Sequence, residues 1–121
     1  MSAHRQPTGR YARTARVNEV LREVLAEEIE RLADADPRLT LLTVTGVRTD
    51  PDLRHATVLL ATLGPEAVAA LGEARVRLQA TVGRQVRMKC TPHLTFSADP
   101  AVASGQRVEE ILRGLRAGEE P

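Results

Sequence analysis

The sequence has very few aromatic residues and almost no cysteine. Tyr11 and Phe96 are its aromatic side chains, and Cys90 is its one cysteine. Sheets that recognise single-stranded RNA stack bases on aromatic side chains, so two aromatics cannot supply such a platform. One cysteine excludes a disulfide within the chain and fits a reducing compartment. We therefore expect a cytoplasmic protein.

Long apolar runs are also missing. No stretch approaches the roughly 18 apolar residues that are needed to cross a membrane. The N-terminal residues are basic, with His4 and Arg5, but no apolar segment follows them, so we do not expect a secretory signal. The sequence predicts no association with a membrane.

Motifs of enzymes and cofactor sites are absent as well. There is no Gly-Lys-Ser/Thr phosphate loop, no dinucleotide-binding glycine pattern and no nucleophile with a helper at a suggestive spacing. The histidines His4, His55 and His93 are scattered, with no pair at a zinc-binding spacing. Asp50 and Asp52 have no third ligand at a suitable spacing, which favours a role in a turn over a metal site. We therefore expect no enzymatic activity, metal, cofactor or small-molecule substrate.

Basic and acidic residues are segregated along the chain although the formal net charge is only +1. The acids are concentrated between residues 19 and 36 and near the C-terminus. Between Ala74 and Phe96 there is no acidic residue, and the five basic ones are Arg75, Arg77, Arg84, Arg87 and Lys89. Such a stretch creates a local positive potential, which favours docking at a defined place on a polyanion. The alternative is an ordinary solvated surface.

The length of 121 residues predicts one domain. Residues 1–13 are polar and basic without periodicity, which predicts a flexible N-terminal arm; this arm either contacts nucleic acid or is a disordered end without a role. Residues 14–116 form the predicted domain, and residues 117–121 form a predicted flexible tail.

Apolar residues at helical spacing predict an amphipathic helix from Thr14 to about Asp36. Thr14 is the candidate N-cap, and Pro37 ends the helix because it disfavours the α region for the residue before it. The opening turns carry Arg13 and Arg16, whereas the later turns carry most of the acids. One end of this helix is therefore suited to phosphate and the other is not.

Three strands are predicted, two before the second helix in the sequence and one after it. Apolar alternation over 39–48 slips by one residue at Gly46, which predicts a bulge, and alternation resumes over 53–63, so the two strands form an antiparallel hairpin. A third strand is predicted over 94–98. After Pro100, spaced apolar residues predict a short closing helix over 102–115.

A second helix is predicted from Pro65 to about Val86. Val68, Leu71, Ala74, Leu78, Val82 and Val86 form its apolar stripe, with Arg77, Arg84 and Arg87 on the opposite side. A straight helix places Arg75 inside the stripe and Val76 outside it. We therefore predict a break between residues 72 and 76, with a kink at Ala74, Arg75 and Val76.

Residues spread along the whole chain carry a family resemblance. In the first half they are Arg16 with Val17, Asp36 to Leu39, Thr43 with Val44, and Val47. Further on they are Asp52 with Leu53, Ala56, Val58, Gly83, Pro92, Leu94, Phe96, Asp99, Gly105 and Arg107. Their order and spacing resemble the ribosome-binding factor A family, bacterial assembly factors of the small ribosomal subunit, from about Arg10 to Leu115.

This resemblance implies an α+β, K-homology-like fold of type II order, helix–strand–strand–helix–kink–helix–strand with a short C-terminal helix. In the family the kink falls at an Ala-x-Gly sequence, whereas here Val76 replaces the glycine. The resemblance also implies a monomeric, non-enzymatic RNA-binding factor in ribosome biogenesis. Such a factor contacts 16S ribosomal RNA on the free 30S subunit near its neck and decoding region, promotes late rRNA processing, and leaves before translation begins.

Charge segregation selects the residues that we predict to contact RNA. They are Arg75, Arg77, Arg84, Arg87 and Lys89, with Arg10, Arg13 and Arg16 as a second patch. Because aromatics are scarce, recognition is expected to rest on backbone and shape. The alternative function is a protein–protein interaction module that docks through the sheet or the closing helix; a ligand-sensing or enzymatic domain is a third.

Overall fold

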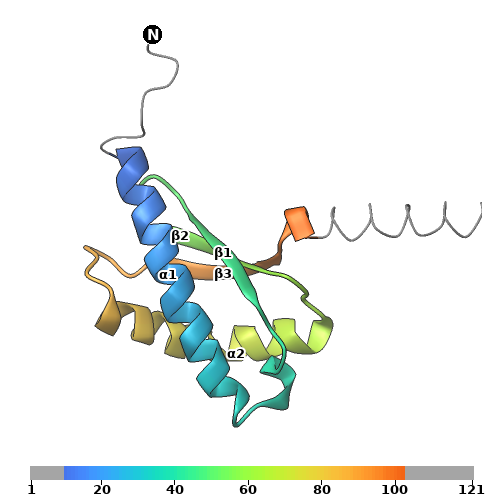
Figure 1. Cartoon of the computed structure of the whole chain (residues 1–121). Helices are drawn as coiled ribbons and strands as arrows, with labels where there is room; N and C mark the ends of the chain where they lie inside the picture. Colours follow the sequence, from blue (N-terminus) through green and yellow to red (C-terminus); the bar gives the residue numbers. More distant parts are fainter. Residues whose placement is uncertain (1–9, 103–121) are drawn as a thin grey trace, which may run out of the picture.

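The computed structural model describes residues 10–102. The elements in chain order are α1 (Arg10–Ala33), the short 3-10 helix η2 (Pro37–Leu39), β1 (Val44–Thr49), β2 (His55–Leu60), α2 (Pro65–Gln85) and β3 (His93–Ala98). Figure 1 shows α1 crossing in front of the sheet, with α2 lying across the lower part of α1. The predicted α+β class and the order of the strands are confirmed.

The three strands form one sheet in the order β1-β2-β3. β1 and β2 pair as an antiparallel hairpin, and β3 lies parallel to β2 because α2 carries the chain back to the starting edge. The predicted hairpin and three-stranded sheet are confirmed. β1 starts at Val44 instead of the predicted Leu39, because Leu39 belongs to η2 and a turn follows it.

The bulge predicted at Gly46 is confirmed. The register of β1 against β2 shifts between Val44 and Gly46, so Thr45 is the extra residue. Thr45 Oγ1 donates a hydrogen bond of 2.6 Å to Asp99 Oδ2, beyond the end of β3, and the Ala101 amide donates to Asp99 Oδ1. The first of these bonds is the main reason why the pKa of Asp99 lies below its ordinary value. The bulge therefore links the two edge strands.

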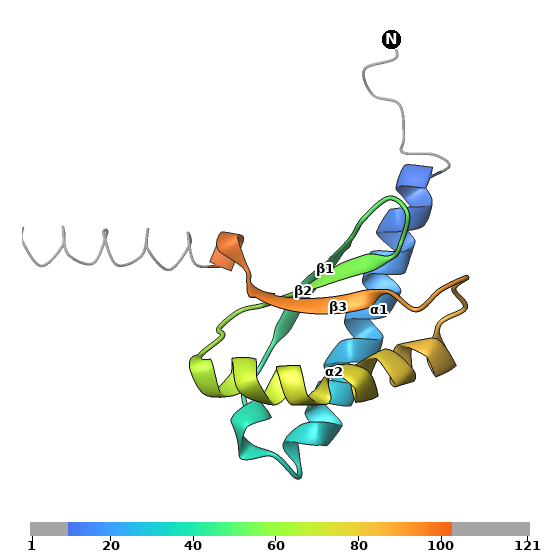
Figure 2. The same cartoon turned by 180° about the vertical axis from the view of Figure 1, so that it is seen from behind.

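The core lies between the helices and one face of the sheet. Its fully buried side chains include Leu21 and Leu25 of α1, Val58 and Leu60 of β2, Leu71, Leu78 and Val82 of α2, and Leu94 of β3. Most of the apolar stripe predicted for the second helix is thus confirmed, but Val68 is half exposed. Figure 2 shows β2 and β3 from the opposite face, which no described helix covers.

The first helix begins earlier than predicted. α1 starts at Arg10, so Thr14 lies within the helix and the N-cap assignment is wrong. Residues 10–13 likewise belong to the helix rather than to the predicted basic arm. The residues between Arg10 and Thr14 include no proline or glycine, so nothing local stops the helix from extending backwards. The remainder of the arm, residues 1–9, lies outside the described residues.

The second helix continues through residues 72–76, where the kink is predicted. α2 is helical without interruption, so Ala74, Arg75 and Val76 are all helical. The prediction required Val76 to be buried and Arg75 to be exposed, but Val76 is 76% exposed and Arg75 is half-buried. An arginine stem can lie along apolar surface, and a single exposed valine is tolerated. The axis of α2 bends gently near its middle in Figure 2, and the kink stays a prediction.

The closing helix and the tail lie mostly beyond the described residues. Residues 100–102 are helical, which agrees with the start of the predicted closing helix. Residues 103–121, with the predicted tail 117–121, lie outside the described residues.

An arginine clamp fixes η2 against the middle of α2. Arg38 Nη2 lies 2.8 Å from Asp36 Oδ2 and 2.9 Å from Glu73 Oε1, and Arg38 Nη1 donates to Glu73 Oε2 at 3.0 Å. Asp36 also caps η2 by accepting from the Arg38 amide, and Pro37 suits the first turn of the 3-10 helix. These bonds raise the pKa of Arg38 and lower the pKa of both carboxyls.

The clamp predicts an acid-dependent loss of stability. Because the folded pKa values of Asp36 and Glu73 are lowered, the unfolded chain binds more protons, and stability rises with pH. The contribution is present above the ordinary carboxyl pKa of about 4 and is lost as the pH falls through the lowered values. The melting temperature should therefore fall more steeply between about pH 5 and 3 in the wild type than in Arg38→Met. Equal slopes would contradict the clamp.

Candidate nucleic-acid interface

The end of α2 and the loop that follows it are held in a defined position. The Gln79 side chain accepts a hydrogen bond of 3.0 Å from the Leu94 amide, so α2 is tied to the exposed edge of β3. At Gly83 the loop comes so close that a Cβ would lie 3.0 Å from Thr91 Oγ1. Close packing of the loop on the helix therefore positions residues 86–90, which carry Arg87 and Lys89.

Three of the predicted cations in this region are exposed and uncompensated. Arg84, Arg87 and Lys89 are exposed, and no ion pair joins any of them to a carboxylate within residues 10–102. Arg84 Nη2 donates to Thr81 Oγ1 at 3.1 Å, and the buried Thr81 hydroxyl donates to the Arg77 carbonyl. The Arg84 guanidinium is thus oriented by a neutral partner, which leaves its charge available to an anion.

Arg77 and Arg75 have different surroundings. Arg77 Nε lies 3.9 Å from Glu28 Oε2, and Arg31 Nη1 lies 3.4 Å from Glu28 Oε1. Glu28 is only 6% exposed, so the buried carboxylate offsets part of the positive charge of Arg77. Arg75 is half-buried, and its Nε is buried without a hydrogen-bond partner. The predicted group of five basic residues is therefore divided into three exposed cations without an ion pair in residues 10–102, one arginine beside Glu28, and one half-buried arginine.

The second predicted patch lies on the same side of the molecule. Arg13 and Arg16 are exposed near the start of α1, whereas the side chain of Arg10 is not among those that the structure describes. In both Figure 1 and Figure 2 the N-terminal end of α1 and the C-terminal end of α2 lie on one side. We define the basic edge by its members: Arg13, Arg16, Arg84, Arg87 and Lys89.

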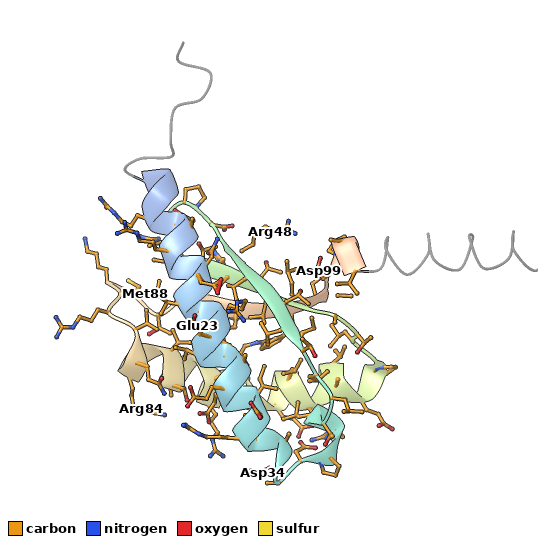
Figure 3. The ribbon with its side chains drawn as sticks, in the orientation of Figure 1. Glu23, Asp34, Arg48, Arg84, Met88 and Asp99 are labelled. Atoms are coloured by element: carbon orange, nitrogen blue, oxygen red, sulfur yellow. The ribbon has the colours of Figure 1, made fainter. Side chains whose placement is uncertain are left out.

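Figure 3 shows how the basic edge is oriented. Arg84 and Met88 lie to the left of α1, whereas Arg48 lies on the other side of the helix, near the hairpin. Asp34 lies at the lower end of α1, away from its N-terminal end. Arginines that are distant in the sequence therefore lie on one side, and the acids of α1 are spread from the middle of the helix to its C-terminal end.

Many acids of α1 are already paired with arginines of the same helix. Glu19 accepts from Arg22 Nε at 2.9 Å, and Glu27 Oε1 lies 2.6 Å from Arg31 Nη2. The first pair lowers the pKa of Glu19 and raises the pKa of Arg22, mainly through the side-chain hydrogen bond. These exposed pairs offset only part of the negative charge of α1, because residues 19–31 carry five glutamates and two arginines.

The hairpin turn contains a group that the spacing argument missed. His55 Nδ1 lies 3.6 Å from Asp50 Oδ2, and ligand atoms of Asp50, Asp52 and His55 all lie within 4.8 Å of one another. The argument that no third ligand accompanies the two aspartates is therefore wrong. The register of the turn, in which the Asp50 amide donates to the His55 carbonyl, brings the histidine back beside the aspartates. All three side chains are exposed, and the absence of a metal stays a prediction.

Residues 10–102 form a K-homology-like α+β fold that presents cations near the start of α1 and around the end of α2, and these two features define the class of protein. None of the helices in residues 10–102 is both long and apolar enough to cross a membrane. Within that class, residues 13–112 match the family model described as ribosome-binding factor A. The chain belongs to the ribosome-binding factor A family.

Individual relatives agree with this assignment. A ribosome-binding factor A from Rubrobacter xylanophilus is 44% identical over 107 residues, which cover 84% of this chain and 86% of the relative. The crystal structure of ribosome-binding factor A from Thermus thermophilus superposes with a TM-score of 0.64 at 40% identity, covering 70% of this chain and 94% of that one.

A second solved structure carries information on a complex. It is a homology model of the Thermus thermophilus ribosome binding factor A, fitted into a cryo-EM map of a 30S complex of that protein. It matches with a TM-score of 0.58 at 40% identity and covers 69% of this chain and 91% of that one. The likeness extends over about 70% of this chain and more than 90% of each Thermus thermophilus chain.

Proposed function

We propose that this protein is a non-enzymatic ribosome assembly factor of the cytoplasm. It binds the free 30S subunit as a monomer and promotes late maturation of 16S ribosomal RNA. Membership of the ribosome-binding factor A family and the 30S complex of the Thermus thermophilus relative support this target. The observation that carries the proposal is the basic edge, where Arg84, Arg87 and Lys89 are exposed without an ion-pair partner among residues 10–102.

Phosphate contacts account for the binding. The planar fork of arginine matches two phosphate oxygens at once, and the edge presents such forks from two helices at separate points. A rigid domain with two separated contact points binds best to RNA conformations in which two RNA segments lie at one particular distance, and it disfavours other conformations. The scarcity of aromatic side chains fits recognition by shape rather than by stacked bases. The protein would thus stabilise one conformation of the maturing RNA without catalysing a reaction.

The salt dependence of subunit binding tests this mechanism. If about four phosphates are neutralised, the logarithm of the binding constant should fall with the logarithm of salt at a slope of about −3, or roughly 60-fold between 50 and 200 mM salt. Co-sedimentation with purified free 30S subunits measures this slope. A slope near zero would instead favour the alternative function, a protein interaction through the uncovered sheet face or the closing helix.

The maturation step needs a separate readout. Cells that lack the protein should accumulate 16S precursors, and the wild-type protein should restore processing. A variant that carries Arg84→Glu and Arg87→Glu should fail to restore it at equal cellular protein levels. Full restoration by this variant would remove the basic edge from the mechanism.

A further inference from the structure

A groove of about 580 Å³ runs between α1 and the segment that leads into β1. It is lined by Ala26, Ile29 and Glu30 of α1, by Asp34 directly after the helix, and by Leu41 and Leu42 of the connecting segment. Figure 3 shows Asp34 at the far end of α1 from its N-terminus, so this groove lies away from the arginines that begin the helix. It is a different surface from the one proposed to contact RNA.

The floor of the groove is apolar. Ile29 is buried, and Ala26 and Leu42 are half-buried, so part of their surface faces the groove. A volume of this size lies within the range of sites that bind small molecules or peptide side chains. The floor can therefore accept apolar side chains from another molecule.

The rim of the groove is acidic and uncompensated. Glu30, in the last turn of α1, and Asp34, directly after the helix, are exposed and form no ion pair within residues 10–102. Arg22, which also lines the groove, is already paired with Glu19 and Glu23. Like charges that line one groove repel each other, so a cation between them would relieve their repulsion. Phosphate would be repelled by the same pair, which excludes RNA as the occupant.

Leu41 supplies an exposed apolar anchor beside this rim. Its side chain is 90% exposed, and its backbone has φ of 68°, in the left-handed region that a leucine rarely adopts. Strain of this kind persists where the surrounding structure holds it, and it is concentrated at binding sites. The conformation keeps a large apolar side chain in solvent next to the apolar floor.

We propose that this groove docks an extended segment of another protein, one that presents an apolar side chain to Leu41 and Leu42 and a basic side chain to Glu30 and Asp34. The apolar side chain of the partner stabilises the complex by burying apolar surface, and its basic side chain makes binding selective through charge complementarity. Because the groove lies away from the basic edge, one molecule can hold RNA and a basic protein segment together. The proposal does not depend on the target of the basic edge.

Peptide titration monitored by amide NMR spectra tests the proposal on the full-length protein. The probe is an acetylated Lys-Leu-Lys-Val-Lys-Leu peptide, and its charge-reversed counterpart is Glu-Leu-Glu-Val-Glu-Leu. The lysine peptide should shift amide signals of residues 26–44 and leave those of residues 84–89 unchanged. The glutamate peptide should cause no such shifts. Absence of binding up to millimolar peptide, or shifts located elsewhere, would overturn the proposal.

Matched substitutions separate the groove from general surface effects. Leu41→Ser should weaken the peptide at least fivefold, whereas Val76→Ser, at an exposed valine on α2, should leave its affinity unchanged. Glu30→Lys with Asp34→Lys should weaken it at least tenfold, whereas Glu66→Lys should not. Equal effects of the test and control variants would overturn the assignment.

A glycine variant distinguishes a binding role for Leu41 from a structural one. Leu41→Gly suits the left-handed backbone, so the melting temperature should stay the same or rise while peptide affinity falls. Retained affinity in Leu41→Gly would contradict the anchor. Concentration-dependent dimerisation that Leu41→Ser abolishes would show that the occupant is a second copy, which would also overturn the proposal.

Discussion

Reversing two charges at the end of α2, Arg84→Glu together with Arg87→Glu, is expected to weaken binding to free 30S subunits at least about a hundredfold at moderate salt. Both side chains are exposed, and neither has a carboxylate partner among residues 10–102, so the full charge change acts on the bound phosphate. The salt slope should become shallower by about 1.5 units, because two of the four phosphate contacts are lost. Co-sedimentation across a salt series measures both quantities.

A matched control comes from the other side of the molecule. Arg48 is also exposed, and Figure 3 shows it across α1 from Arg84, so Arg48→Glu should change binding far less than Arg84→Glu alone. The melting temperature of the charge-reversed proteins should stay close to that of the wild type, since Thr81 keeps its bond to the Arg77 carbonyl. Similar losses of binding in Arg48→Glu and Arg84→Glu would show that only overall charge matters.

Truncating the core of α2 should produce the largest change in stability. Leu78 is fully buried in the packed core between the helices and the sheet. Leu78→Ala removes apolar contacts and leaves a cavity, so the free energy of unfolding should fall by about 2–5 kcal/mol. Urea unfolding at 25 °C measures the change, with the slope of the transition checked for two-state behaviour.

Val76→Ala is the control for this substitution. Val76 lies on the same helix only two residues earlier, but it is 76% exposed. The free energy of unfolding should therefore change by less than about 0.5 kcal/mol, with any shift towards stability because alanine favours helix more than valine. A loss in Val76→Ala as large as in Leu78→Ala would mean that the helix is rotated about its axis.

The strands and the core could be predicted because their signals are local. The slip of the apolar alternation at Gly46 appears directly as the bulge, and the stripe through Leu71, Leu78 and Val82 is the buried side of α2. Both patterns depend on which residues must avoid water, which is set by residue type. The parallel pairing of β3 with β2 was not predicted, because alternation of apolar residues indicates a strand but not the strand that it pairs with.

Two expectations relied too much on the type of a single residue. Arg75 was expected to be exposed, but it is half-buried, because a long side chain can bury its stem and keep its charged end in water. Thr14 was taken as a cap because threonine is common there, although nothing before it stops the helix. Side-chain length decides how far an arginine can be buried, and the absence of a stop signal decides where a helix begins more than one residue that is common at caps.

The sequence predicted which basic residues lie near the end of α2, but not which of them are compensated by a carboxylate. The sequence groups Arg77 with Arg84, yet a partner across the interface between α1 and α2, Glu28, decides that Arg77 is partly compensated. Such pairing depends on how two helices pack, which spacing within one helix does not give. The same reason explains why His55 was not recognised beside Asp50, since the hairpin register joins them.

The central claim is that the loop after α2 lies against ribosomal RNA, and the one cysteine of the chain allows a direct test. Cys90 is exposed in that loop next to Lys89, so an iron chelate attached to it produces hydroxyl radicals at the basic edge. Primer extension on bound 30S subunits should show strong, localised cleavage of 16S RNA from Cys90. The same chelate at position 48, in a Cys90→Ser and Arg48→Cys protein, should cut these nucleotides weakly or not at all. Strong cleavage from position 48 with none from Cys90 would contradict the account.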